Sequence, residues 1–135
     1  CPMRWMLDTN ICIAIIRRRP EAALRRLRGK SIGQVGISSL TLAELHYGAA
    51  RSREPAAARD ALVEFVVALE VAPFDDAAAA IYGEVRAQLE SRGQPIGPID
   101  TLIAAHALTL ETVLVTNNLR EFHRVRGLVV EDWLN

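Results

Sequence analysis

Cysteine is scarce in this chain: only Cys1 and Cys12 occur among its 135 residues. Two cysteines cannot build a disulfide framework, and their spacing matches no zinc-binding knuckle. Cys12 lies between Ile11 and Ile13, which is typical of a small side chain buried in a hydrophobic core. We therefore expect a protein of the reducing cytoplasm, with neither structural disulfides nor structural zinc.

Long apolar runs are also lacking. No segment approaches the ~20 apolar residues that a membrane-spanning helix needs. The first residues show no basic stretch followed by an apolar signal core, so neither membrane insertion nor export is expected. The chain contains no glycine-rich loop of the kinds that hold nucleotide phosphates, which argues against the fingerprint-bearing nucleotide-binding folds.

Half of the residues are apolar, which suits one compact domain with a substantial core. No change of composition marks a linker, and no repeat or low-complexity tract occurs. Residues 1–2 precede Met3 and look like a cloning remnant, so we place the domain at residues 3–135.

Positive charge comes almost entirely from arginine, because Lys30 is the only lysine. The 16 basic and 16 acidic residues balance, so bulk charge alone will not attract nucleic acid. The arginines nevertheless gather in runs, and a guanidinium grips phosphate at two points. These runs either bind phosphate or form solvated helix faces; they lie at residues 17–19, 25–28 and 51–53.

Short apolar segments alternate with helical patterns along the chain. We expect strands over residues 4–7, 35–37, 70–72, 113–115 and 128–130. Helices are expected over residues 11–16, 21–28, 40–48, 55–69, 77–91 and 100–110, with Ser38 or Ser39 capping the third. This alternation predicts an α/β fold, in which helices flank a short, mostly parallel central sheet on both faces.

Polar side chains follow three of the predicted strands directly, with Ser38 and Ser39 after the second strand. Asp8 follows the first strand, and Thr116 follows the strand that ends at Val115. In open α/β sheets, functional sites form beyond the carboxyl ends of the strands. Asp8 is therefore either a plain helix cap or a ligand in a partly buried crevice, and Thr116 could orient a ligand by hydrogen bonding.

Further acidic and amide side chains lie near predicted helix starts. Glu44 interrupts an apolar run, so it either faces solvent or needs a partner for a buried charge. Asp100 could cap the helix that follows it or bind a ligand. Asn118 offers a neutral oxygen and Glu121 a fourth acid, although an asparagine-rich turn that caps a short helix explains both equally well.

Three carboxylates at one end of a sheet repel one another unless a cation neutralises them. Oxygen ligands favour Mg²⁺, with Mn²⁺ as a substitute. The three histidines show no spacing that would bind zinc. One of them, His106, lies in an alanine-rich helix and is expected to pack in the core. Such an ion can activate a water against a phosphodiester. We therefore interpret Asp8, Glu44 and Asp100 as metal ligands for phosphodiester hydrolysis.

Four segments in this order resemble the PIN-domain nucleases, and more closely the VapC-type toxins of bacterial toxin–antitoxin pairs. They are Met6–Asn10, Ser38–Leu45 with Gly48, Gly97–Asp100 and Thr116–Phe122. The resemblance implies a Mg²⁺- or Mn²⁺-dependent endoribonuclease with Asp8, Glu44 and Asp100 at the acidic positions of the family. Asn118 stands at a fourth position that is often aspartate, which leaves a second metal position open; Thr116 and Glu121 would support the site.

The resemblance also implies partners. Toxins of this type form homodimers and are silenced by a cognate VapB-type antitoxin, which lays a C-terminal segment across the active-site groove. The antitoxin also binds promoter DNA, so the toxin reaches DNA only indirectly. Relatives cut structured RNA, with initiator transfer RNA as the leading substrate. We expect the RNA backbone to be held by Arg17, Arg18, Arg25 and Arg51.

Two other functions stay open on the sequence alone. An aspartate after the first strand can accept a phosphoryl group in phosphomonoester hydrolysis, but that chemistry needs a second acid two positions later, where Asn10 stands. A non-catalytic PIN-like interaction module is the other alternative. The intact set of Asp8, Glu44 and Asp100 argues against a decayed site of that kind.

Overall fold

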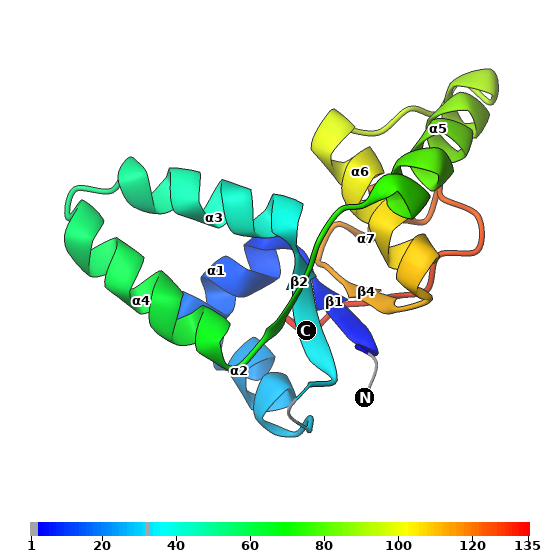
Figure 1. Cartoon of the computed structure of the whole chain (residues 1–135). Coiled ribbons are helices and arrows are strands. Elements are labelled where there is room, and N and C mark those ends of the chain that lie inside the picture. Colours follow the sequence, from blue (N-terminus) through cyan, green and yellow to red (C-terminus); the bar gives the residue numbers. More distant parts are fainter. Residues whose placement is uncertain (1–2, 32) are drawn as a thin grey trace.

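The central sheet has five short strands in the order β3-β2-β1-β4-β5. The computed structural model describes residues 3–31 and 33–135, so residues 1–2, the expected cloning remnant, lie outside the described part (Figure 1). All four strand pairings are parallel. The strands are β1 (Trp5–Leu7), β2 (Val35–Ser38), β3 (Glu70–Ala72), β4 (Val113–Val115) and β5 (Val130–Glu131).

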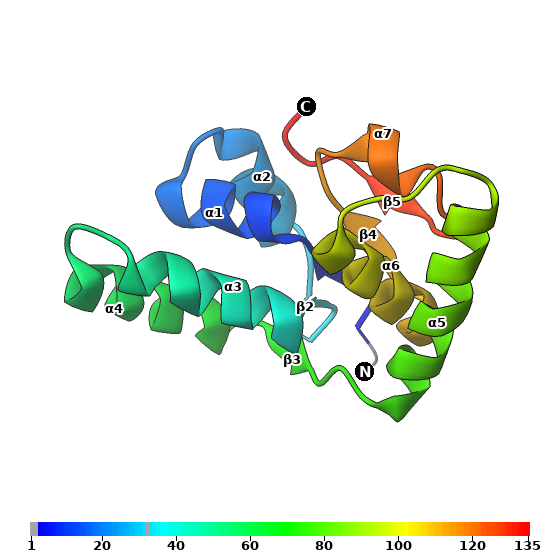
Figure 2. The ribbon, with the colours of Figure 1, turned by 90° about the horizontal axis from the view of Figure 1, so that it is seen from above.

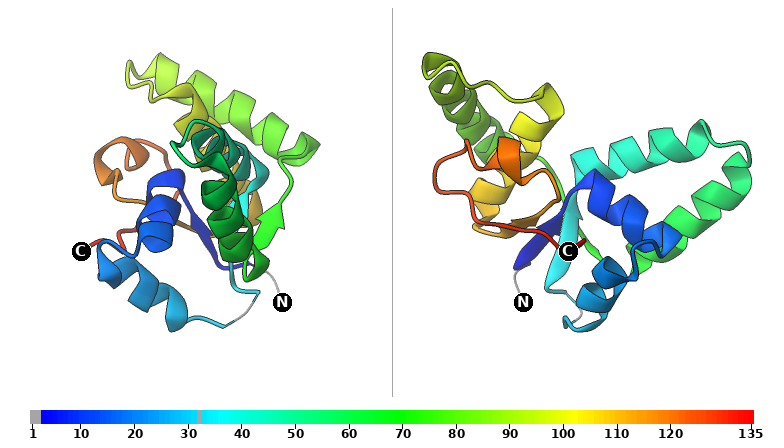
Figure 3. Two further views of the ribbon diagram at one scale, coloured as in Figure 1. Left: turned by 90° about the vertical axis from the view of Figure 1, so that its left-hand side faces the viewer. Right: turned by 180° about the vertical axis from the view of Figure 1, so that it is seen from behind.

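Helices connect the strands, as the alternating pattern predicts. Across the described residues they are α1 (Thr9–Arg17), α2 (Glu21–Arg28), α3 (Ser39–Ala50), α4 (Pro55–Val67), α5 (Asp76–Ser91), α6 (Pro98–Leu110) and α7 (Leu119–Phe122). Helices α3 and α4 form a hairpin that extends away from the sheet (Figure 3). None of the helices in the described part is both long and apolar enough to span a bilayer.

Helices cover both faces of the sheet because residues along each strand alternate between two cores. Leu7 packs with α1, α2, α3 and α4 on one face, together with Val115 from β4. Met6 and Leu114 point to the other face and pack against α5, α6 and α7. Figure 2 shows these two groups of helices on either side of the strands. The predicted α/β fold with a sheet flanked by helices is confirmed.

Several element boundaries differ from the prediction. The sixth helix begins at Pro98, two residues before Asp100, because proline fits the first turn of a helix, where its missing N–H has no partner. Gly97 is the N-cap residue of α6, so Asp100 does not cap the helix. The last strand begins at Val130 rather than at residue 128, since only residues 130 and 131 pair with β4, while Leu128 packs in the second core.

The chain order places a switch point beside β1. From this central strand the chain passes to β2 and β3 on one side and later to β4 and β5 on the other. The backbone N–H of Asp8 donates to the carbonyl of Val115 over 2.9 Å, which aligns the carboxyl ends of β1 and β4. A crevice at such a point is the usual place for a site in an open α/β sheet.

Candidate active site

Asp8 is both a helix cap and a buried acid. Its Oδ1 accepts a hydrogen bond from the backbone N–H of Ile11 over 3.0 Å, which makes Asp8 the N-cap of α1. Its Oδ2 accepts a short hydrogen bond from the hydroxyl of Thr116 at the end of β4. The side chain is only 7% exposed, and this burial, with the charge of Glu44, raises its pKa despite the two hydrogen bonds.

Glu44 faces the same place from α3. Its Oε1 accepts a hydrogen bond from the hydroxyl of Thr9, the first residue of α1, over 2.6 Å. The residue is partly buried and lies on the helix that begins directly after β2. Glu44 is therefore not a free surface glutamate: a neighbouring helix holds its carboxylate beside Asp8.

Asp100 lies in the first turn of α6 and meets a second acid from α7. Burial raises the pKa of Asp100 to about 6, and the charge of Glu121 adds most to this effect, followed by the charges of Asp8 and Glu44. A hydrogen bond between Asp100 and Glu121 acts in the same direction. Glu121 is oriented in turn by Asn118, whose Nδ2 donates to its Oε2 over 2.6 Å.

Thr116 connects this group to Asp8. Its Oγ1 donates to Asp8 and accepts the backbone N–H of Asn118 over 3.0 Å. Asn118 occupies the N-cap position of α7 but makes no side-chain cap bond, because its amide faces Glu121 instead. Thr116, Asn118 and Glu121 thus form a hydrogen-bonded support behind the acids.

The three acids line one pocket of about 180 Å³, whose lining residues are Asp8, Thr9, Asn10, Glu44, Asp100 and Ile103. Asp8 directly follows β1, Glu44 lies on α3 and Asp100 on α6, so the three acids are separated by 36 and 56 positions in sequence. The expectation that these carboxylates converge at the sheet end is therefore met. A phosphomonoesterase of the kind considered above would need a second acid two positions after Asp8. Asn10 occupies that position at the pocket wall, so this acid is missing.

The donors fit a hard divalent cation by their chemistry. All are oxygens, and burial together with nearby negative charge raises the pKa of Asp8 and Asp100, so a positive charge in the pocket would stabilise their ionised forms. No ion pair joins these acids to an arginine or lysine within the described residues. In the same part of the chain, no group of three His, Cys, Asp or Glu side chains is already arranged to hold a metal ion, so binding would require the carboxylates to draw closer.

The four arginines expected to bind RNA are dispersed over the surface. Arg17, at the end of α1, lines a groove together with Glu44, one of the three acids. Arg18 ends α1 with a left-handed backbone, and Arg25 pairs with Glu21 on α2 at 4.0 Å. The guanidinium of Arg51 lies over the ring of Tyr47 at the far end of α3. Of these four, Arg17 is the one that the structure places close to the pocket.

Three residues that contact the site or its supporting elements were assigned no part in the site from the sequence. Thr9 binds Glu44, and its place beside Asp8 in the strand-ending motif is a signal that could have been read. Ile103 forms the apolar wall of the pocket, three residues after Asp100 on the same helix face. His106 was expected to serve packing, yet its ring is hydrogen-bonded to Ser38.

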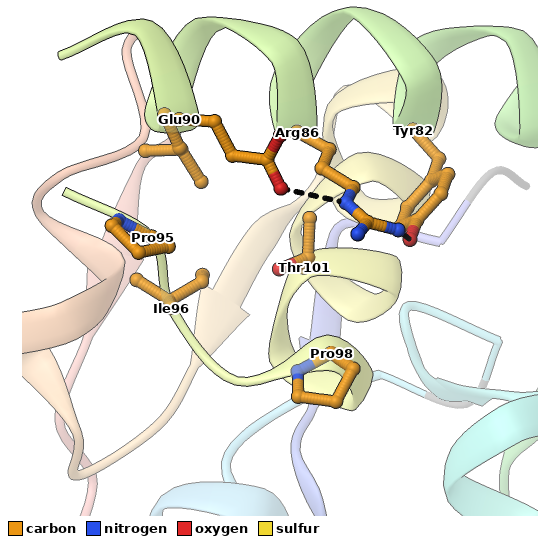
Figure 4. A pocket seen from close by; sticks show the side chains of 8 residues that line it. Tyr82, Arg86, Glu90, Pro95, Ile96, Pro98 and Thr101 are labelled. Carbon is orange, nitrogen blue, oxygen red and sulfur yellow. Dashed lines mark hydrogen bonds and ion pairs between the residues drawn. The ribbon is translucent and has the colours of Figure 1, made fainter. Parts of the chain in front are cut away.

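A second pocket lies between α5 and α6 (Figure 4) and has a volume of about 250 Å³. It borders the first turn of α6 at Pro98 and Thr101 but contains none of the three acids. Arg86 there is held by Glu90 and by the hydroxyl of Tyr82, both at 3.0 Å. Its charge is thus satisfied within α5, and we place the chemistry in the smaller, acidic pocket.

Comparison with known proteins identifies the class. A family model described as "PIN domain" matches residues 5–128, which is nearly the whole chain. The chain therefore belongs to the PIN-domain family of nucleases, and the enzymes of this family depend on a divalent metal ion.

Individual relatives show which group within the PIN-domain nucleases the chain resembles most. A "tRNA(fMet)-specific endonuclease VapC" from Shigella flexneri is 45% identical over 97% of this chain and 98% of its own length. The same enzyme from Salmonella typhimurium is 44% identical over the same shares. A crystal structure titled "DNA bound VapBC from Salmonella typhimurium" matches with a TM-score of 0.92, at 44% identity over 97% and 98% of the two chains. Within the PIN family, this chain is a member of the VapC ribonucleases.

Proposed function

We propose that this chain is the toxin of a toxin–antitoxin pair and cleaves RNA phosphodiester bonds with Mg²⁺, or Mn²⁺ in its place, held by Asp8, Glu44 and Asp100. The observation that carries the proposal is the convergence of these three acids on one pocket. Burial, followed by the charges of Glu121, Asp8 and Glu44, raises the pKa of Asp100, and a bound cation would favour its ionised form. Membership of a metal-dependent nuclease family supports the same interpretation.

Each residue of the pocket has a separate task. A bound divalent cation lowers the pKa of water and stabilises the charge that develops on the phosphate. Thr116 and the N–H of Ile11 fix the two oxygens of Asp8, so this carboxylate cannot rotate away. Thr9 does the same for Glu44. Glu121 contacts Asp100 from the other side, and Asn118 orients Glu121 by donating its Nδ2 proton to it.

Transfer RNA is the proposed substrate class, because the most similar VapC relatives described above are named as tRNA(fMet)-specific endonucleases. Arg17 lines a groove that shares Glu44 with the acidic pocket, so it is suited to bind a phosphate near the bond that is cut. Arg18, Arg25 and Arg51 would contact the RNA farther from the pocket. A transfer RNA substrate places this activity in the cytoplasm.

A VapB-type antitoxin is the proposed partner. The solved relatives from Salmonella typhimurium and Rickettsia felis are VapBC complexes bound to DNA, and the latter is titled as bound to a fragment of their promoter. We extend this arrangement to the present chain: a homodimer of the toxin binds its antitoxin, and the antitoxin carries the complex to promoter DNA.

Induced expression without antitoxin tests the proposal. The test variant is Asp8→Asn, because asparagine caps helices as well as aspartate and so leaves α1 intact. The matched control is Asp75→Asn, since Asp75 caps α5 with the same Oδ1 hydrogen bond, at 3.0 Å to Ala78, outside the pocket. The parent and Asp75→Asn should arrest growth and produce discrete RNA ends, and Asp8→Asn should do neither. Equal cleavage by folded Asp8→Asn would contradict the assignment.

A further inference from the structure

His106 and Ser38 form a buried hydrogen bond that the catalytic assignment does not use. His106 lies on α6 and is 1% exposed, and Ser38 is the fully buried last residue of β2. The Nδ1 of His106 is 2.8 Å from the Oγ of Ser38. The imidazole also packs edge-to-face with the ring of Phe74, with centroids 5.3 Å apart and planes at 79°, and this contact further restricts its orientation.

Ser38 has a second task, because it is the N-cap of α3. Its Oγ accepts the backbone N–H of Leu40 over 3.1 Å. Burial lowers the pKa of His106, so its ring is neutral at pH 7 and carries one proton. The arrangement that satisfies every group has the Ser38 hydroxyl donate to Nδ1, which leaves a lone pair of Oγ for Leu40. His106 thereby fixes the rotamer of the cap.

This hydrogen bond joins the two elements that bring Glu44 and Asp100 to the pocket. Glu44 lies on α3, six positions after Ser38, and Asp100 lies on α6, six positions before His106. Among the described residues, His106–Ser38 is the one side-chain hydrogen bond between α6 and the β2–α3 junction. A helix rises about 1.5 Å per residue, so Glu44 lies about 9 Å along α3 from Ser38, and a tilt of about 6° at the cap would displace it by about 1 Å.

A neighbouring contact holds the same junction. The Oγ of Ser39 accepts the backbone N–H of Phe74 over 3.0 Å, and Phe74 packs against His106. The start of α3 is thus held by α6 and by the segment that follows β3. Within residues 3–31 and 33–135, Thr9 from α1 is the one side chain that donates a hydrogen bond to the Glu44 carboxylate itself.

We propose that His106 is a positioning residue: through Ser38 it fixes the start of α3 against α6, and so holds Glu44 opposite Asp100. This inference rests on the proposed function, because it assumes that these two acids bind the metal together. Misplacement of a catalytic group by about 1 Å can lower a rate by about 100-fold. Simple core packing, the alternative, predicts that only stability depends on His106.

Two substitutions of His106 separate these interpretations. His106→Leu removes the acceptor for Ser38 and keeps an apolar side chain of similar bulk. His106→Asn keeps an acceptor oxygen near the place of Nδ1 and should restore the bond. Val85→Ala is the control for stability, because Val85 is buried on α5 in the core formed with α6 but neither lines the acidic pocket nor takes part in the hydrogen bonds of Ser38. Ser38→Ala removes the same bond from its other end and serves if His106→Leu does not fold.

The measurements are Mn²⁺ affinity by calorimetry, kcat and KM on a transfer RNA substrate, and the thermal midpoint of each variant. We expect His106→Leu, or Ser38→Ala, to weaken Mn²⁺ binding about 10-fold and to lower kcat by about 10-fold or more, with KM nearly unchanged. His106→Asn should recover most of both. Val85→Ala should lower the thermal midpoint without changing either quantity.

Unchanged Mn²⁺ affinity and kcat in a folded variant that lacks the bond would overturn the inference. An equal loss in Val85→Ala would do so too, because the effect would then follow stability. Glu44→Gln separates this failure from that of the proposed function. If Glu44→Gln binds Mn²⁺ and cleaves RNA like the parent, the metal assignment itself is wrong; if it is inactive while the His106 variants are unaffected, only the positioning role fails.

Discussion

In the pocket at the ends of β1 and β4, Asp8, Glu44 and Asp100 lie together, with no arginine or lysine paired to them among the described residues. Beside α2, the chain uses charge differently. Glu131 accepts hydrogen bonds from Arg26 at 3.5 Å and from the indole N–H of Trp133 at 3.0 Å. The charge of that glutamate is therefore balanced within the fold.

Lys30 completes the cluster beside α2. Its Nζ lies 4.2 Å from the ring of Trp5 and 5.7 Å from that of Trp133, and Arg26 also lies over Trp133. Opposite charges and aromatic faces stabilise this region. The acidic pocket gathers like charges at the expense of stability, which is typical of a site shaped by function. The contrast makes the pocket the expected binding place for a cation.

The largest effect is expected from Asp100→Asn, which breaks the acidic pocket directly. Loss of a residue that only supports a metal ligand costs about 10–100-fold in activity, so loss of a proposed ligand should cost more than ~100-fold. Single-turnover RNA cleavage at saturating Mg²⁺ measures this. Cleavage within a few fold of the parent would remove Asp100 from the metal site.

Thr116→Val should have the next largest effect. Valine has the shape of threonine but cannot donate to Asp8 or accept from Asn118, so both lose a partner. We expect kcat to fall by about 10–100-fold. The hydrogen bond from Thr116 lowers the pKa of Asp8, so its loss should raise that pKa further. The pH profile of cleavage should therefore shift upward. A profile and rate like those of the parent would show that Thr116 has no supporting role.

The stability of the metal-free protein should depend on pH through Asp100. Its pKa is raised from 3.8 to about 6 in the folded protein, so between these values the folded state binds more protons than the unfolded state. Stability from this group is therefore greatest below pH 4 and is lost as the pH rises to about 6. Urea unfolding in a chelator, compared with Asp100→Asn, isolates this contribution.

At pH 7 the metal-free Asp100→Asn variant should be more stable than the parent, and the gain should disappear near pH 4. Added Mg²⁺ should stabilise the parent but not the variant, because a ligand that binds only the folded state raises its stability. If the difference in free energy of unfolding between parent and variant does not change with pH, the pKa of Asp100 is not raised in the folded protein.

The smallest effect is expected in the cluster beside α2. Lys30→Met keeps the length of the side chain and removes its charge over Trp5 and Trp133. An exposed cation–π contact is worth about 0.5–1 kcal/mol, so the free energy of unfolding should fall by about that amount. RNA cleavage should stay at the parent level. A loss of cleavage without a loss of stability would instead assign Lys30 to RNA binding.

Much of the fold follows from local patterns in the sequence. The helix at residues 21–28 and the strands at 70–72 and 113–115 match the prediction, because apolar runs between turn residues define them. The predicted bounds of the last strand were wrong. Residues 128–130 are all apolar, so the sequence does not distinguish them, and pairing with β4 determines which residues belong to the sheet. Likewise, the start of α6 at Pro98 depends on a cap at Gly97 that has no polar side chain.

The site shows the same limit. The positions of Asp8, Glu44 and Asp100 could be singled out because each is an acid beside an apolar run near a strand or helix end. Thr116 and Glu121 could also be named as supports from their positions. The pairing of Thr9 with Glu44 and of His106 with Ser38 could not, because these bonds span 35 and 68 positions. Contacts of that span depend on how the elements pack, which no local pattern encodes.

The central claim is that Asp8, Glu44 and Asp100 form one metal site. Calorimetric titration of Mn²⁺ into the parent, Asp8→Asn, Glu44→Gln and Asp100→Asn, each checked for folding by circular dichroism, tests it most directly. We predict that all three folded variants lose at least about 10-fold in Mn²⁺ affinity, because each removes one of three ligand carboxylates. Folded variants that bind Mn²⁺ as tightly as the parent would contradict the account.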